Sequence, residues 1–208
     1  MSIQFASFTL IFLFLPITML LFYLTPNRWK REVMLGISLL FLCSGGWLAA
    51  AVEILLTALT YGAGLLLEHL RQRKHLSRLV LTGSILLHFG ALLLLRSDWL
   101  FSLKAGWFSG KSLFPLGLAF FTLQSVGYCI DVFRGKIHGE KNWRQLGLYL
   151  LFYPRLIMGP VVSYSVAVKS LCTPVFDIAR VGQGLLRFLV WLGKKLILAN
   201  WLGMLFQT

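Results

Sequence analysis

The chain has 208 residues, of which 58% are hydrophobic and only 13% are charged, and its mean hydropathy is +0.78. A soluble globular domain carries about 25% charged residues, so this composition excludes an ordinary water-soluble core and favours a lipid bilayer as the main solvent. The formal net charge of +13 comes from short basic clusters between apolar runs, which argues against nucleic acid as a partner. We therefore expect an all-α, polytopic integral membrane helical bundle with interfacial amphipathic helices.

The first apolar run, 5–24, is long enough to cross a hydrocarbon core of roughly 30 Å at about 1.5 Å per residue. No basic segment precedes it and no small-residue cleavage pattern follows it, so a removable signal peptide is not expected. The next apolar stretch, 33–67, is too long for one crossing, and its paired glycines Gly45 and Gly46 predict a turn there.

We predict a single transmembrane domain over 1–208, with spans at about 5–24, 33–44, 47–67, 79–95, 113–130 and 146–164. The aromatic segment 97–112 is expected at the membrane surface. The last apolar stretch, about 182–206, holds Arg187, Lys194 and Lys195. The free-energy cost of inserting these three cations into lipid would nearly cancel the free energy gained by burying the apolar residues of the stretch. That stretch is therefore expected to lie along the interface or to line a cavity.

The basic connectors predict the orientation of the chain in the membrane. Most Lys and Arg before the sixth span fall at 28–31, 71–78 and 134–144, three connectors that share one side. The positive-inside rule places that side in the cytoplasm and the amino terminus outside.

Metal binding is not predicted by the cysteines and histidines. Cys43, Cys129 and Cys172 show no CxxC spacing, and His69 and His75, six residues apart, would point to different faces of a helix. His88 lies within an apolar run, where an ionisable residue is a functional candidate, but no carboxylate is close enough in sequence to orient it.

Two further features indicate a polar passage through the bundle. Asp131 and Arg134 are spaced for a helical ion pair, which would act either as a topological anchor or as the cytoplasmic mouth of a substrate path. Arg155 stands between Pro154 and Gly159-Pro160 within an apolar run, which predicts a broken helix that lines a polar cavity. Arg155 would contact a phosphate-bearing donor or an anionic polymer, or pair with a buried acid.

The segment PLGLAFFTLQSVGYCIDVFRGK at 115–136 resembles a signature region of the membrane-bound O-acyltransferases, in their alginate O-acetylase branch. Three more segments agree in family order: FTLIFLFLPITMLLFYLTPNRWK, LYLLFYPRLIMGPVVSY and GLLRFLVWLGKKLILANWL. The resemblance implies the N-terminal part of a bacterial inner-membrane enzyme of alginate biosynthesis. Such an enzyme binds no resident cofactor, and takes acetyl-CoA or another cytoplasmic acyl donor as substrate for O-acetylation of an exported polysaccharide. Accessory acetylation proteins are its implied partners.

This sequence departs from the family pattern at several points. Family members are roughly twice as long, none of the four histidines here matches a family histidine motif, and no catalytic residue is therefore assigned within the chain. Arg155, Ser163 and Asn200 stand where the branch usually has glutamine, arginine and aspartate. The chain is expected to be catalytically incomplete by itself. A non-catalytic scaffold of a polysaccharide-export or acetylation complex, and a small transporter, remain alternatives.

The candidate residues for a substrate path or cavity are Gln124, Asp131, Arg134, Tyr153, Pro154, Arg155, Gly159, Pro160, Lys194, Lys195 and Asn200.

Overall fold

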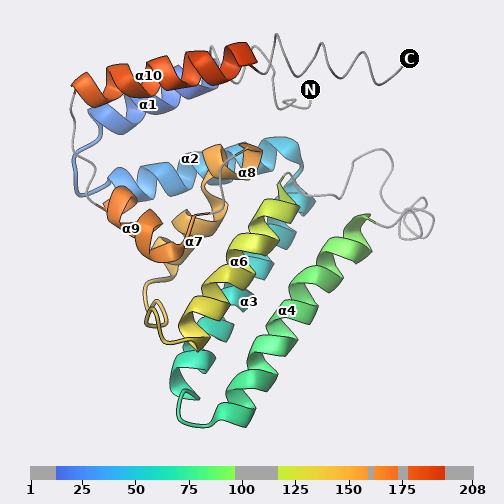
Figure 1. The fold of residues 1–208 in the computed structure, drawn as a ribbon. Coiled ribbons are helices and arrows are strands. Elements are labelled where there is room, and N and C mark those ends of the chain that lie inside the picture. Colours follow the sequence, from blue (N-terminus) through green and yellow to red (C-terminus); the bar gives the residue numbers. More distant parts are fainter. Residues whose placement is uncertain (1–12, 97–116, 159–161, 173–177, 195–208) are drawn as a thin grey trace, which may run out of the picture. The chain divides into compact units, whose positions relative to one another are not determined.

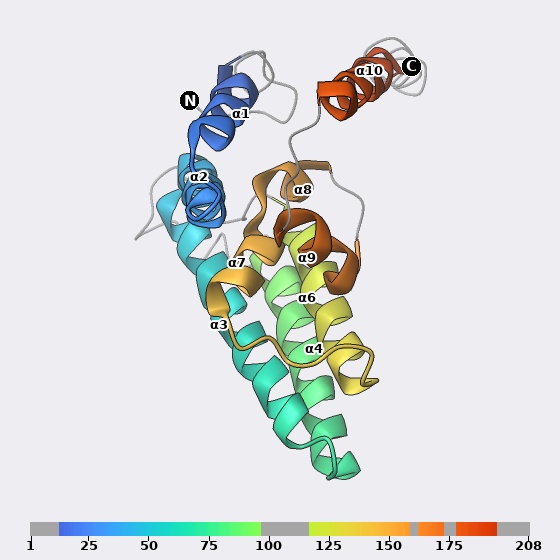
Figure 2. The same cartoon turned by 90° about the vertical axis from the view of Figure 1, so that its left-hand side faces the viewer.

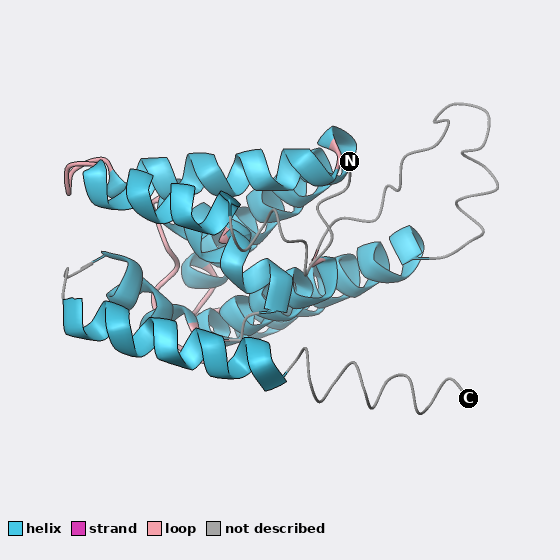
Figure 3. Cartoon of the chain, turned by 90° about the horizontal axis from the view of Figure 1, so that it is seen from above, coloured by secondary structure: helices cyan, strands magenta, loops and turns pink. Residues whose placement is uncertain are grey.

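The computed structural model describes residues 13–96, 117–158, 162–172 and 178–194. Within these residues all regular structure is helical, and no strand is present (Figure 3). The chain divides into two compact units, 1–172 and 173–208. The first unit contains α1 (Leu15–Leu24), α2 (Lys30–Gly45), α3 (Trp47–His69), α4 (Lys74–Arg96), α6 (Leu118–Phe133), α7 (Trp143–Leu151), α8 (Tyr153–Met158) and α9 (Tyr164–Cys172). The second contains α10 (Ile178–Gly193).

The long apolar stretch after the first connector is divided by glycine. Helix α2 ends at Gly45, and Gly46 has a φ of 142°, a conformation that residues with a Cβ rarely adopt. The Gly46 N–H donates to the carbonyl oxygen of Cys43 at 3.1 Å, and α3 begins at Trp47. The break therefore falls where the paired glycines predicted a turn.

Helices α3, α4 and α6 form the centre of the first unit and run side by side (Figures 1 and 2). Helices α2 and α7 pack against α3, and α8 contacts both α2 and α6. The largest fully buried apolar side chains come from α3, α6, α7 and α8. They are Leu67, Leu118, Phe121, Tyr128, Val132, Leu146, Tyr149, Leu150 and Leu156.

The distribution of polarity is that of a membrane bundle. Leu79, Leu86 and Leu93, seven residues apart on α4, are 68%, 67% and 68% exposed. Several polar side chains, in contrast, are buried between helices: Glu53, Thr60, His88, Gln124 and Ser125. Both α3 and α4 are long and apolar enough to cross a membrane. Leucines thus face outward on α4 while several polar side chains lie between the helices of an otherwise apolar core, as a lipid solvent favours.

Several predicted boundaries can be compared with the described residues. The first span is described from residue 13, and the predicted surface segment 97–112 lies outside the described part. The predicted fifth span appears as α6, which continues to Phe133, and the sixth apolar run is divided among α7, α8 and the start of α9. Of the predicted interfacial stretch 182–206, residues 182–194 are described and belong to the second unit.

His88 connects helices in the core of the first unit. Its Nδ1 donates to the Ser84 carbonyl oxygen at 2.8 Å, and its Nε2 lies 2.9 Å from the Thr60 hydroxyl on α3. The ring stacks on Phe121 of α6 with centroids 6.2 Å apart, and the residue is only 1% exposed. Because both ring nitrogens are engaged, His88 has the contacts of a structural link between helices.

Candidate functional site

The sixth apolar run is interrupted at Phe152, where the backbone becomes extended with a ψ of 106°. Helix α8 begins at the next residue, and Pro154 is its second residue. Proline is tolerated in the first turn, because the N–H groups there have no acceptor within the helix. The backbone N–H groups of Arg155 and Leu156 both donate to the Phe152 carbonyl oxygen, at 3.0 and 3.3 Å. The interruption thus places Arg155 in the first turn of a short new helix.

The guanidinium group of Arg155 lies among aromatic rings. Its Cζ is 5.8 Å from the Tyr149 ring centroid and 5.7 Å from that of Phe152, within the range of cation–π attraction. Its Nη1 atom is buried, yet it has no hydrogen-bond partner in the described part of the chain. The ion pairs found among described residues do not include Arg155. A half-buried cation with a buried, unused donor is suited to bind an anionic group.

Gln124 and Tyr153, two other predicted cavity residues, have different environments. Gln124 is 2% exposed on α6, and its Oε1 has no hydrogen-bond partner among described residues. Tyr153 is a packing residue, since its ring lies 5.1 Å from that of Phe14 and 5.4 Å from that of Phe41. The Tyr153 backbone N–H donates to Ser38 Oγ at 3.4 Å, which ties α8 to α2.

The predicted ion pair between Asp131 and Arg134 is wrong. Asp131 Oδ1 instead lies 3.6 Å from Lys136 Nζ. Helix α6 ends at Phe133, and the chain then turns so that the Lys136 N–H donates to the Asp131 carbonyl oxygen at 3.0 Å. Arg134, at the end of the helix, is exposed. The turn, and not the helical spacing, selects the partner of Asp131.

The connector 134–142 is fixed to α3 by Glu68. His138 Nδ1 donates to Glu68 Oε1 at 2.9 Å, and the Gly139 N–H donates to Glu68 Oε2 at 3.2 Å. Glu68 lies just beyond the predicted span 47–67, and these two hydrogen bonds hold the pKa of its carboxyl group below the ordinary value. The Tyr61 hydroxyl adds a donated bond to the Lys141 carbonyl oxygen at 2.7 Å. Arg71 of the connector 71–78 also donates to the Gly135 carbonyl oxygen at 3.4 Å, so two connectors that the charge pattern assigns to one side meet in the fold.

The end of this connector forms a polar network with α7 and α9. Tyr164 donates its hydroxyl to Glu140 Oε2, and Gln145 Nε2 lies 3.3 Å from both Glu140 Oε2 and the Tyr164 hydroxyl. The backbone N–H of Glu140 donates to the Tyr128 hydroxyl at 2.8 Å. Four separate segments are thus joined around Glu140, through its carboxylate and its backbone N–H.

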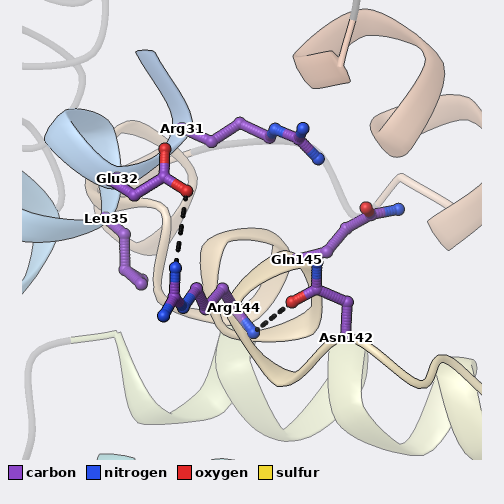
Figure 4. A pocket seen from close by; sticks show the side chains of 6 residues that line it. All are labelled: Arg31, Glu32, Leu35, Asn142, Arg144 and Gln145. Atoms are coloured by element: carbon purple, nitrogen blue, oxygen red, sulfur yellow. Dashed lines mark hydrogen bonds and ion pairs between the residues drawn. The ribbon is translucent and has the colours of Figure 1, made fainter. Parts of the chain in front are cut away.

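A pocket of about 140 Å³ opens beside this network, between the first turns of α2 and α7 (Figure 4). It is lined by Arg31, Glu32, Leu35, Asn142, Arg144 and Gln145. Arg144 Nη1 lies 3.8 Å from Glu32 Oε1, and Asn142 caps α7 by accepting the Arg144 N–H at 3.1 Å. The pocket joins the first and third predicted cytoplasmic connectors.

The remaining predicted site residues fall outside the described residues or in the second unit. Gly159, Pro160, Lys195 and Asn200 lie outside the described residues. Lys194 is exposed and belongs to the second unit.

Sequence reasoning missed the pocket residues, as well as Glu140, His138 and Tyr164. Their partners lie far away in the sequence, so no local spacing reveals them. The clustering of charge at 28–31 and 134–144 was the available signal.

Comparison with curated proteins confirms the resemblance to alginate O-acetylases. The chain is 27% identical over 203 residues to a probable alginate O-acetylase AlgI of Pseudomonas fluorescens, covering 96% of this chain and 39% of that protein. The corresponding proteins of Pseudomonas putida and Pseudomonas aeruginosa are 28% and 26% identical, over 96% and 97% of this chain and 43% and 41% of theirs. The chain matches their N-terminal part and spans about two-fifths of their length. No family model and no solved structure matches the chain.

Proposed function

We propose that this chain acts as the N-terminal part of a membrane-bound O-acyltransferase, which transfers acetyl groups from a cytoplasmic donor to hydroxyl groups of an exported polysaccharide. The names of the curated relatives support acetyl transfer and a polysaccharide acceptor. The apolar outer face of α4 and the buried polar residues support a membrane setting. The bacterial source of the relatives favours the bacterial inner membrane, and the charge pattern favours an amino terminus outside with the basic connectors in the cytoplasm.

The proposal rests at the level of single residues on Arg155, whose buried Nη1 atom has no hydrogen-bond partner among the described residues. In the proposed reaction Arg155 binds an anionic group of a substrate, either a phosphate of the acyl donor or a carboxylate of the polymer. The Tyr149 and Phe152 rings hold the guanidinium in place without neutralising it, because a ring offers its face and no formal charge.

A histidine that gives general-base assistance to the attacking hydroxyl needs a free ring nitrogen. His88 does not meet this requirement, since Ser84 and Thr60 occupy its two nitrogens. In the proposal this chain binds and orients substrate, and proton transfer falls to a residue other than His88.

Replacing Arg155 by alanine in the cells that make this protein tests the proposed role. We expect ester-linked acetate on the exported polysaccharide to fall about tenfold or more, because a hydrogen bond to a charged group contributes about 1.5–3 kcal/mol. The measurement is acetate released by mild alkali per sugar residue, at equal membrane levels of the two proteins.

Arg78→Ala is the matched control, since Arg78 is an exposed cation on α4 outside the candidate site. Its acetate content should stay within about twofold of wild type, as expected for a surface charge. Equal acetate in the Arg155 and Arg78 variants would exclude the role given to Arg155. Unchanged acetate after deletion of the whole gene would exclude acetyl transfer as the function.

A further inference from the structure

We propose that the pocket between α2 and α7 binds a phospholipid headgroup that carries a phosphate and a hydrogen-bond donor, as phosphatidylethanolamine does. This site is separate from Arg155 and does not depend on acetyl transfer. Arg31 and Arg144 form a basic half of the pocket, and Glu32 forms an acidic half (Figure 4).

The basic half suits a phosphate group. The 3.8 Å separation between Arg144 Nη1 and Glu32 Oε1 is too long for a hydrogen bond, so the donors of Arg144 are not consumed by that pair. Arg31 lines the same pocket and takes part in no ion pair among the described residues. Planar guanidinium groups bind phosphate oxygens through paired hydrogen bonds.

The two helix starts add to this attraction. The first turns of α2 and α7 border the pocket, and the first N–H groups of a helix have no partner within the helix. Together with the helix dipole they favour an anion at this end. On α7, Asn142 already accepts two of the first N–H groups, that of Arg144 through its side chain and that of Gln145 through its carbonyl oxygen.

The acidic half of the pocket requires a hydrogen-bond donor, which a phosphate group alone does not supply. Glu32 Oε2 is buried, and it has no hydrogen-bond partner in the described part of the chain. A buried carboxylate oxygen without a donor is costly, and a bare phosphate beside it would be repelled. A ligand that combines phosphate with an ammonium group satisfies the arginines and Glu32 together.

The position of the pocket favours a lipid over a soluble molecule. Leu35 forms an apolar wall and is only 9% exposed, and α2 continues from the pocket into the apolar run 33–44. Basic residues at the end of a membrane span lie at headgroup level and attract phosphate groups of lipids. A headgroup in the pocket would leave its acyl chains beside this apolar run.

Native mass spectrometry of the purified protein, released from nanodiscs with equal amounts of phosphatidylethanolamine and phosphatidylcholine, tests the proposal. Phosphatidylcholine has the same phosphate but no N–H donor. We expect several-fold more bound phosphatidylethanolamine in the wild type. Glu32→Gln should bring the ratio of the two lipids close to one, whereas Arg31→Gln with Arg144→Gln should lower binding of both about tenfold.

Arg78→Gln is the control, because this exposed arginine does not line the pocket, and it should bind lipids as the wild type does. Equal binding of both lipids by the wild type would overturn the proposal, as would unchanged binding in the double arginine variant. A second arm titrates soluble O-phosphoethanolamine into phosphatidylcholine nanodiscs. Weak binding of O-phosphoethanolamine supports a lipid headgroup as the ligand of the pocket. Binding as tight as that of phosphatidylethanolamine would overturn the proposal of a lipid and assign the pocket to a free phosphate ester.

Discussion

Replacing Gly117 by alanine is expected to destabilise the first unit by about 2–5 kcal/mol. Gly117 caps the start of α6 with a φ of +80°, a left-handed conformation that costs a residue with a Cβ about 1–2 kcal/mol. The new Cβ would also meet the backbone carbonyl of Leu156 at the Arg155 helix, and crowding of this kind typically costs about 1–3 kcal/mol. Because the obstructing atom belongs to the backbone, a side-chain rotation cannot relieve it.

Gly127→Ala is the matched control on the same helix. A Cβ at Gly127 meets nothing within 4 Å, and alanine is favoured over glycine inside a helix by about 1 kcal/mol. Thermal unfolding in detergent, followed by circular dichroism, should therefore show a lower midpoint for Gly117→Ala and an equal or higher one for Gly127→Ala. Equal midpoints for the two variants would contradict the packing of α6 against α8.

Gly64→Val is expected to separate α3 from α6 and the connector 134–142, at a cost of about 1–3 kcal/mol. A Cβ at Gly64 would lie 2.7 Å from the Tyr128 hydroxyl oxygen. Tyr128 is only 1% exposed, and its hydroxyl accepts the Glu140 N–H, so it cannot move aside freely. Gly139 approaches the same turn of α3 and would lose its position beside Glu68.

Gly62→Val, two residues earlier on α3, introduces the same side chain where a Cβ meets nothing within 4 Å. Both variants carry the same change in helix propensity, so the difference between their unfolding midpoints isolates the clash. We expect faster proteolysis of the connector 134–142 in Gly64→Val but not in Gly62→Val. Identical cleavage rates would show that the connector does not depend on contact with Gly64.

Local signals in the sequence predicted the helical elements well, because hydrophobic length and glycine or proline act over a few residues. The turn at Gly46 and the break near Pro154 follow directly from backbone chemistry. The side of the membrane on which each connector lies stays a prediction, but Arg71 and Gly135 do join two of these connectors through a hydrogen bond.

Contacts between distant segments could not be predicted in this way. Thr60 and His88 are 28 residues apart, and Glu68 and His138 are 70 apart, so no sequence spacing pairs them. The failed pair between Asp131 and Arg134 has a local cause, since the turn that follows α6 brings Lys136 to Asp131. The pocket escaped prediction because it exists only when α2 and α7 are packed together.

Alkaline carbonate extraction of membranes from cells that make the protein tests the central claim most directly. The exposed leucines on α4 and the polar groups buried between helices favour lipid around the first unit. We predict that the protein remains in the membrane pellet at alkaline pH and enters solution only with detergent. Recovery of a folded monomer in the detergent-free supernatant would contradict the account.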